Sequence, residues 1–322
     1  MKKHWIVVTL ALALVLTACG QGSTEGNKKA AGEGGSAGKK VGVIQFIDQI
    51  SLDAVNEGFT EEMKKLDPDV EIIPMNAQGE VATINQITQK LVQEKVDVIF
   101  AIATPAAQGA LQGKGDIPLV FAAVTDPKGA GLESQSTGVT DYVDPRDQLD
   151  EYLKMFPNLK TLGTLYNTGE QNSRVQVEDL EKACKEKGLK LESQGINNIN
   201  DIPQALGLLA GKIDGYFAIT DNYVASAASL VTKTLNEKKI PSCSAEEGQA
   251  KNGLLMAQGV NYKESGEQAA ALVHEILSGK KATDLPIEGP KNLHTVFNTK
   301  TAKLLGIEEA AYPKGDQVEL IK

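Results

Sequence analysis

The stretch VDVIFAIATPAAQGAL, residues 96–111, decides the fold. Its first half is a nearly continuous apolar run, which predicts a buried strand over Val96–Ala103. Thr104 and Pro105 follow at once, and a threonine N-cap with proline at the first helical position is typical of a helix start. A buried strand that leads directly into a helix indicates a parallel sheet with helices on both faces.

The same alternation recurs on both sides of this stretch. The first half predicts further strands at Val41–Phe46, Val70–Met75, Ile117–Val124 and Thr137–Tyr142, with helices near 52–66, 81–94 and 105–112. The second half predicts strands at Leu162–Tyr166, Leu189–Gln194, Ile213–Ile219, Ile240–Cys243 and Leu254–Gly259, with helices near 172–187, 201–211, 222–238 and 263–279. We therefore predict an α/β protein of two Rossmann-like lobes with parallel sheets, five strands in each.

The lobes are expected to be joined by three crossings of the chain. Asp144-Pro145-Arg146 marks the first, because proline restricts itself and its predecessor to extended or turn geometry. The helix at 263–279 is expected to return to the first lobe, and the strand Leu293–Asn298 with the helix Thr299–Leu305 to the second. The predicted lobes are 41–143 plus 262–290, and 144–261 plus 291–322.

The N-terminal sequence is typical of an export signal. Lys2, Lys3 and His4 precede an apolar run that ends at Leu16, far short of the ~20 residues of a spanning helix. Residues 1–18 are therefore predicted to be a signal peptide, and Leu16-Thr17-Ala18-Cys19 resembles the lipobox of bacterial lipoproteins, in which the cysteine is acylated. The alternative is an ordinary signal peptide with an incidental cysteine. Residues 19–40 are rich in Gly, Ser and charge and are expected to form a flexible linker.

Chain length, net charge and cysteine content limit the folds and partners that the sequence allows. About 280 of the 322 residues remain for folding, which exceeds a typical single core and fits two lobes. The net charge of -9 argues against a nucleic-acid partner. Cys184 and Cys243 could pair in an oxidising compartment, but two separate thiols are expected, and no Cys/His spacing indicates a metal site.

Polar residues collect where the predicted strands end, and in open α/β sheets the ligand crevice lies beyond those carboxyl ends. The candidate ligand-binding residues are Gln45, Phe46, Ser51, Thr104, Pro105, Ala106, Thr125 and Asp126 in the first lobe, and Tyr166, Asn167, Asn172, Ser173, Asp221 and Asn222 in the second. Any one of the Ser, Thr, Asp and Asn residues could simply cap a helix. Their concentration at five strand ends is what indicates a site.

The chemistry of these residues favours a zwitterion. Free N–H groups at a helix N-terminus, aided by the hydroxyl of Thr104 or Ser173, can hold a carboxylate. Asp221 can hold an ammonium group through charge-assisted hydrogen bonds, and the asparagines offer both donors and acceptors. The sequence therefore predicts a small amino acid-like ligand held between the lobes.

At these residues the chain resembles the TrpX-type ABC substrate-binding lipoproteins, a family associated with aromatic amino-acid uptake. The resemblance runs from Val41 to about Phe297 and rests on Val43-Ile44-Gln45-Phe46, Ile102–Gly109, Ala122–Pro127, Leu165-Tyr166-Asn167, Glu170-x-Asn172-Ser173 and Asp221-Asn222. It implies a type I periplasmic-binding-protein fold, ABC permease and ATPase subunits as partners, and a monomer lipid-anchored on the extracytoplasmic face of the cell membrane. It also implies tryptophan, tyrosine or phenylalanine as ligand, with Phe46 either stacking on its ring or lying in the lobe core, and Tyr166 and Tyr223 as further aromatic candidates.

The sequence gives less support to other functions. No G-x-S-x-G, H-E-x-x-H or P-loop pattern is present, so we predict neither an enzyme nor a cofactor. A sugar or purine binder on the same fold is an alternative, although the sole Trp lies at position 5, inside the predicted signal peptide. A surface sensor or adhesin is another alternative, and it is compatible with solute binding.

Overall fold

A computed structural model describes residues 38–322 of the chain. The predicted signal peptide, Cys19 and the linker up to residue 37 lie outside the described residues. Within the described range, no helix is both long enough and apolar enough to cross a membrane.

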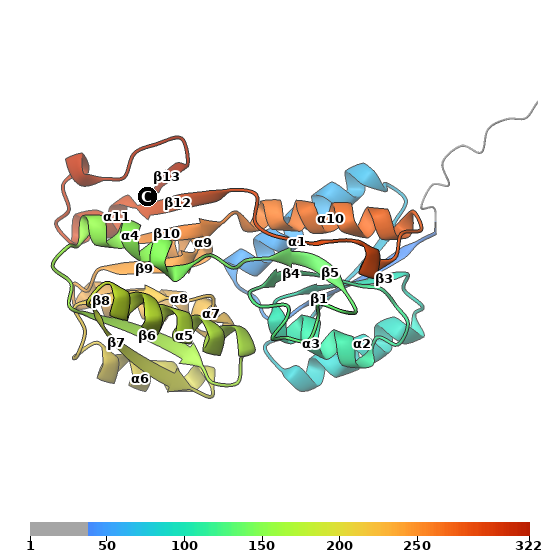
Figure 1. Cartoon of the computed structure of the whole chain (residues 1–322), viewed down its shortest axis with the longest axis horizontal. Coiled ribbons are helices and arrows are strands. Elements are labelled where there is room, and N and C mark those ends of the chain that lie inside the picture. The colour runs from blue at the N-terminus through green and yellow to red at the C-terminus, as the bar shows by residue number, and fades with distance from the viewer. Residues whose placement is uncertain (1–37) are drawn as a thin grey trace, which may run out of the picture. The chain divides into compact units, whose positions relative to one another are not determined.

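The first lobe is built on a six-stranded sheet in which every neighbouring pair is parallel. Its strands are β1 (Lys40–Gln45), β2 (Glu71–Asn76), β3 (Val98–Ile102), β4 (Leu119–Val124), β5 (Thr137–Thr140) and β11 (Ile287–Glu288), in the order β11-β5-β4-β3-β1-β2. Helices α1 (Ile50–Leu66) and α10 (Tyr262–Leu277) cover one face, and α2 (Val81–Gln93) and α3 (Thr104–Gly113) cover the other (Figure 1).

The second lobe holds a seven-stranded sheet. Its strands are β6 (Thr161–Asn167), β7 (Lys190–Ile196), β8 (Gly215–Ala218), β9 (Ser242–Glu246), β10 (Met256–Val260), β12 (Leu293–Asn298) and β13 (Val318–Ile321), in the order β13-β12-β10-β9-β8-β6-β7. Its helices are α4 (Pro145–Met155), α5 (Gln171–Glu186), α6 (Ile202–Leu209), α7 (Asn222–Ser226), α8 (Ala228–Glu237), α9 (Glu247–Lys251) and α11 (Thr299–Leu304). Short 3₁₀ turns lie at Ile199–Asp201, Ala282–Asp284 and Glu309–Ala311.

The predicted fold of two Rossmann-like α/β lobes is confirmed. In each lobe the first five strands along the chain follow the doubly wound order 2-1-3-4-5. The order reverses between β1 and β3 in one lobe and between β6 and β8 in the other, and these are the points where such folds bind ligands. The chain passes between the sheets three times: from β5 to α4, from β10 to α10, and from β11 to β12.

Several details of the prediction were wrong. The sheets have six and seven strands rather than five, and the second sheet is not wholly parallel, because β12 runs antiparallel to β10. No helix was predicted at α4, which Pro145 begins and which the Asp144 side chain caps by accepting from the Arg146 N–H. The helix predicted over 222–238 is interrupted at Ala227, and β9 lies at Ser242–Glu246, farther along the chain than predicted.

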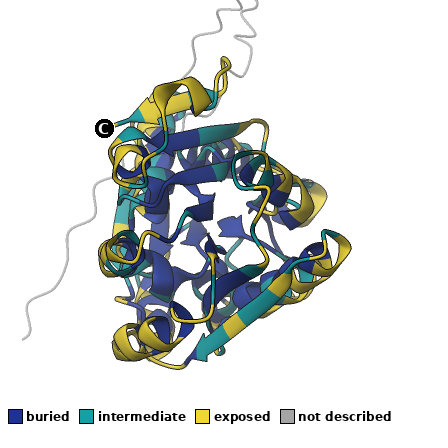
Figure 2. Ribbon diagram, turned by 90° about the vertical axis from the view of Figure 1, so that its left-hand side faces the viewer, coloured by how far each residue is buried: buried dark blue, intermediate teal, exposed yellow. Residues whose placement is uncertain are grey.

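Buried side chains fill both lobes, and Figure 2 shows buried strands inside a layer of helices whose outer faces are exposed. Helices α1 and α10 lie unusually close because glycines face the partner helix. A Cβ on Gly58 would lie 2.1 Å from the Lys263 carbonyl oxygen, and one on Gly266 would lie 2.1 Å from the Val55 carbonyl oxygen. The two cysteines of the described residues, Cys184 and Cys243, are both buried free thiols.

Candidate functional site

The carboxyl ends of the two sheets face each other, and side chains from the two lobes touch there. Thr125, after β4, has its hydroxyl oxygen 3.3 Å from that of Thr220, after β8. Gln176 of α5 donates to the Thr125 hydroxyl at 3.1 Å, and Gln171 donates to the Asp126 carboxylate at 3.0 Å. These contacts join the first lobe to the second, so the cleft between the lobes is closed.

Two hollows lie along this cleft. The inner hollow, of only about 10 Å³, is lined by Gln49, Leu52, Ala123, Thr125, Asp141, Asn172, Thr220, Asn222, Glu246 and Tyr262. The outer hollow, of about 350 Å³, is lined by Phe46, Val81, Asn85, Pro105, Gln108, Gly109, Gln112, Asn167, Gly169, Glu170, Asn197 and Tyr223. Both sets of residues come from both lobes.

Glu170 is a buried carboxylate surrounded by asparagine amides. Its Oε1 accepts from the Asn167 Nδ2 at 3.1 Å, and its Oε2 accepts from the Nδ2 atoms of Asn222 at 2.6 Å and Asn172 at 3.2 Å. Only 3% of the residue is exposed. Burial, together with the nearby Asp221 carboxylate, raises the pKa of Glu170 to about 8, although the three amides oppose this shift.

Asp221 lies behind Glu170 and is fully buried. It caps α7, because its Oδ1 accepts from the Val224 N–H at 2.9 Å. Its Oδ2 accepts from the Ser173 hydroxyl at 2.7 Å and from the Asn167 N–H. Burial raises the pKa of Asp221, and its hydrogen bonds oppose this shift.

The inner hollow contains two further buried carboxylates. Asp141 accepts from the Thr125 hydroxyl at 2.9 Å and from the Tyr262 hydroxyl at 3.1 Å. Glu246 accepts from Gln249 at 2.8 Å and lies 3.5 Å from the side-chain nitrogen of Gln49, in the opposite lobe. Burial raises the pKa of both, that of Glu246 to about 7.

The lining of the cleft therefore holds acidic side chains without a basic side chain among the described residues. Three carboxylates, those of Asp141, Glu170 and Glu246, line the two hollows, and no Lys, Arg or His does so among the described residues. A buried carboxylate is costly unless a cation or several hydrogen bonds compensate it. A ligand that brings a positive charge would supply the missing partner.

Several polar atoms in this region have no partner within the described residues. They include the hydroxyl oxygen of Thr104 and the amide oxygen Oδ1 of Asn172, both buried, and the amide oxygens of Gln171 and Gln249. Thr104 is not the predicted N-cap, because Ala103 takes that position with a positive φ of 85°. The Thr104 hydroxyl therefore makes no cap bond. Backbone strain like that at Ala103 is found more often at ligand sites than elsewhere.

The predicted site residues divide into three groups. Those that line a hollow are Phe46, Pro105, Thr125, Asn167, Asn172 and Asn222. Those that contact these residues or join the lobes are Ser51, whose hydroxyl accepts from the Gly248 N–H, Asp126, Ser173 and Asp221. The remaining residues neither line a hollow nor make these contacts, and they are Gln45, Thr104, Ala106 and Tyr166. Gln45 donates to the Asp53 carboxylate, Ala106 lies in the first-lobe core, and Tyr166 packs in the second lobe.

Sequence reasoning did not name as candidates the acidic residues that line the hollows. Glu170 was quoted only within the motif of the family resemblance, and its carboxylate makes no cap bond to α5. Glu246 ends a strand that was predicted to stop at Cys243. The signal that could have identified both was their position at a strand end, where the other candidates were found.

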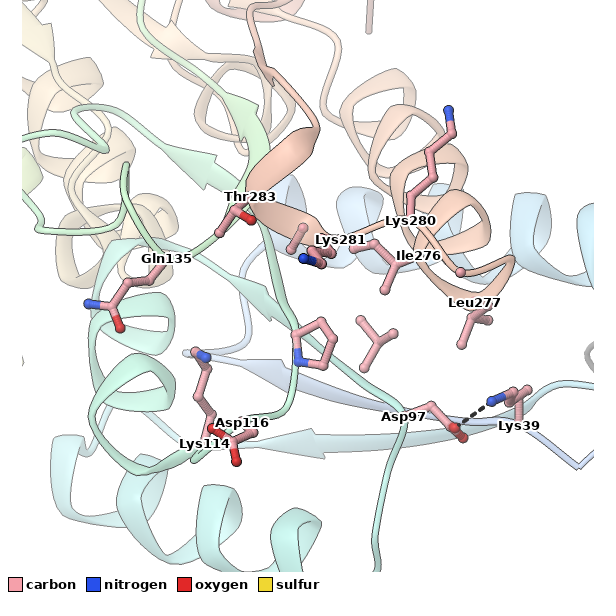
Figure 3. Close-up of a pocket in the computed structure, with 14 residues that line it drawn as sticks. Lys39, Asp97, Lys114, Asp116, Gln135, Ile276, Leu277, Lys280, Lys281 and Thr283 are labelled. Atoms are coloured by element: carbon pink, nitrogen blue, oxygen red, sulfur yellow. Dashed lines mark hydrogen bonds and ion pairs between the residues drawn. The ribbon is translucent and has the colours of Figure 1, made fainter.

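A different hollow lies at the opposite end of the first-lobe sheet, near the starts of β1, β3 and β4. Figure 3 shows lysines around it, among them Lys39, Lys114 and Lys281. Lys39 is paired with Asp97 at 2.9 Å. This hollow does not face the cleft and contains no residue of the second-lobe sheet.

Comparison with known proteins points to one family. Residues 40–311 match the family model described as ABC transporter substrate binding protein. The chain is 33% identical to a protein of Clostridioides difficile named tyrosine-binding protein, over 96% of this chain and 92% of that protein. It is 26% identical to an uncharacterised protein of Rickettsia prowazekii, over 82% and 84% of the two chains.

Solved structures agree with this assignment. An ABC domain of Streptococcus pneumonia in complex with L-Trp has a TM-score of 0.82 at 29% identity, covering 87% of this chain and 99% of that one. The ligand-free, open structure of a substrate-binding protein with adhesive properties from Clostridium difficile has a TM-score of 0.67 at 36% identity, covering 88% and 99%. The score is higher for the tryptophan complex although the identity is lower, which agrees with a closed cleft.

The chain belongs to the ABC transporter substrate-binding protein family, because the family model covers most of its length and a relative above 30% identity spans nearly all of it.

Proposed function

We propose that this member of the family captures one aromatic amino acid, tryptophan, tyrosine or phenylalanine, between its lobes and delivers it to an ABC importer. The observation that carries the proposal is the charge of the cleft, where buried carboxylates line both hollows without a cation among the described lining residues. An amino acid brings an ammonium group that compensates this charge. The two relatives whose names or titles mention tyrosine and tryptophan support the same ligand class.

The carboxylate of such a ligand needs hydrogen-bond donors. Thr104 begins α3, a helix of ten residues whose first-turn N–H groups have no helical acceptor. The Thr104 hydroxyl has no other partner in the described structure. In this proposal the start of α3 and the first turn of α5, at Asn172 and Ser173, hold the carboxylate. A buried carboxylate of the second lobe holds the ammonium group.

The ring of the ligand is assigned to the outer hollow. Phe46 of the first lobe and Tyr223 of the second both line it, and their rings are parallel within 6° with centroids 6.3 Å apart. The Tyr223 hydroxyl also donates to the Gly79 carbonyl at 3.1 Å, which holds it against the first lobe. Phe46 is only 2% exposed and belongs to the first-lobe core, so the half-buried Tyr223 ring offers the larger stacking surface to a planar side chain.

The wider biology follows from the family and the N-terminal sequence. We propose that residues 1–18 are removed, that Cys19 carries the lipid, and that the protein acts as a monomer on the extracytoplasmic face of the cell membrane. Its partners in this proposal are a permease and an ATPase, and it performs no catalysis of its own. The Leu-x-Ala-Cys pattern after the apolar run supports the anchor.

Calorimetric titration tests the ligand class most simply. Tryptophan, tyrosine, phenylalanine, leucine and ribose are each added to the purified protein. We expect one of the three aromatic amino acids to bind far more tightly than leucine, and ribose to give no signal. Absence of binding by all three would refute the ligand assignment while leaving the family and the fold intact.

A further inference from the structure

We propose that Glu170 receives the ammonium group of the ligand, and that Asp221 is a positioning residue behind it. This inference rests on the proposed function and names the contact that makes the site selective for an amino acid. It differs from the expectation drawn from the sequence, in which Asp221 made that contact.

The position of Glu170 carries the assignment. It lines the outer hollow together with Phe46 and Tyr223, the two aromatic residues offered for the ring. Although it occupies the N-cap position of α5, its side chain makes no cap bond there and turns to Asn167 and Asn222 instead. The Glu170 carboxylate therefore has no part in capping α5.

None of the hydrogen-bond donors to Glu170 carries a positive charge. Every hydrogen bond it receives comes from a neutral amide: the side chains of Asn167, Asn172 and Asn222, and the Asn222 N–H at 3.4 Å. These amides orient the carboxylate but cannot neutralise it. The Asn172 amide oxygen, which belongs to a residue bonded to Glu170, is buried without a partner. An ammonium group has three donors and can bind both oxygens.

The other ionisable groups described near Glu170 do not supply a cation that could pair with its carboxylate. Asp221 is a second buried carboxylate, and Tyr223 of α7 is a neutral phenol. The guanidinium group of Arg174, one turn along α5, lies at the surface and donates to the Thr168 carbonyl at 2.9 Å. The first-lobe residues lining the outer hollow carry no ionisable group. Burial and the neighbouring Asp221 carboxylate together raise the pKa of Glu170.

Asp221 is already fully used by the protein. Its two oxygens accept from Val224, Ser173 and Asn167, it is completely buried, and it lines neither hollow. These bonds fix the start of α7, which carries Asn222 and Tyr223. Its role is therefore to hold in place the residues that contact Glu170 and the ring.

The substitution Glu170→Gln tests the assignment, because it removes the charge and keeps the shape. The aromatic amino acid that binds tightest is compared with its deaminated analogue, for tyrosine 3-(4-hydroxyphenyl)propionate. We expect Glu170→Gln to weaken binding of the amino acid by about 10- to 100-fold and to leave binding of the analogue unchanged or stronger. The matched control is Glu178→Gln, at an exposed position on the same helix, which should change neither.

The outcomes separate the two proposals. If the wild-type protein binds no amino acid, the proposed function fails. If it does, and Glu170→Gln retains the full preference for the amino acid over its analogue, the Glu170 assignment is wrong. A crystal structure of the wild-type protein with the bound amino acid tests the Glu170 assignment without any variant. The ammonium nitrogen within hydrogen-bond distance of Glu170 supports the assignment, and contact with Asp221 alone overturns it.

Discussion

Closure of the lobes depends on a glycine where they meet, and Gly248→Ala should disturb closure without disturbing either lobe. Gly248 is the second residue of α9 in the second lobe, and its N–H donates to the Ser51 hydroxyl of α1 at 3.2 Å. A Cβ at this position would lie 2.6 Å from the Ser51 Oγ and 3.0 Å from both the Ile50 Cβ and the Ser51 backbone nitrogen. The last two atoms are fixed by the helix and cannot rotate away.

The size of the effect follows from these distances. Carbon atoms in contact prefer about 3.5–4.0 Å, so the two helices must separate by roughly 0.5–1 Å. Overpacking of this kind costs about 1–3 kcal/mol in a rigid core. Because α1 and α9 belong to different lobes, opening the cleft relieves the overlap and unfolding is not needed. The closed form is then weakened, and ligand affinity should fall about 5- to 150-fold.

Calorimetry and small-angle scattering measure this result. We expect Gly248→Ala to bind weakly, to keep the melting temperature of the ligand-free protein within a few degrees, and to have a larger radius of gyration. Gly207→Ala is the control, because a Cβ there meets nothing within 4 Å, and it should bind normally. Normal affinity of Gly248→Ala would refute the closed arrangement of α1 against α9.

Three further predictions follow from the same structure. Phe46→Leu and Tyr223→Leu should each lower affinity for the aromatic ligand by about 2- to 13-fold in calorimetry, whereas Tyr223→Phe, which keeps the ring, should lose less. The pKa values of Glu170 and Glu246 are raised from 4.5 to about 8 and about 7, so the folded ligand-free protein retains protons that the unfolded chain releases. Its free energy of unfolding should therefore fall as pH rises from about 5 to 8, as measured by denaturant titration, and Glu170→Gln should reduce the slope. Cys19→Ser should move the protein from the membrane fraction to the medium, as seen by immunoblotting.

The sequence predicted the architecture because buried strands in α/β proteins are nearly continuous apolar runs. Val98–Ile102 and Leu119–Val124 are buried at every position, so hydrophobicity alone located them. The start of α4 was missed for a local reason, since Asp144-Pro145 is compatible with both a turn and an N-cap followed by proline. The interruption at Ala227 carries no Gly or Pro and follows from tertiary packing.

The site was only partly predictable because burial of a polar residue is not visible in a linear pattern. Asn172 and Asn222 were recognised from their positions at strand ends, and both line the inner hollow. Glu170 was not named as a candidate, because most acidic residues are exposed and the linear sequence does not show which one is buried. Only the fold brings Asn167 and Asn222, more than fifty positions apart in the chain, around it.

Hydrogen–deuterium exchange with and without the aromatic amino acid tests most directly whether one ligand is held by both lobes. We predict slower exchange on ligand addition in two separate segments, residues 103–107 at the start of α3 and residues 167–173 before and within α5. Protection confined to one lobe, or to the lysine-lined hollow at the far end of the first sheet, would contradict capture in the cleft.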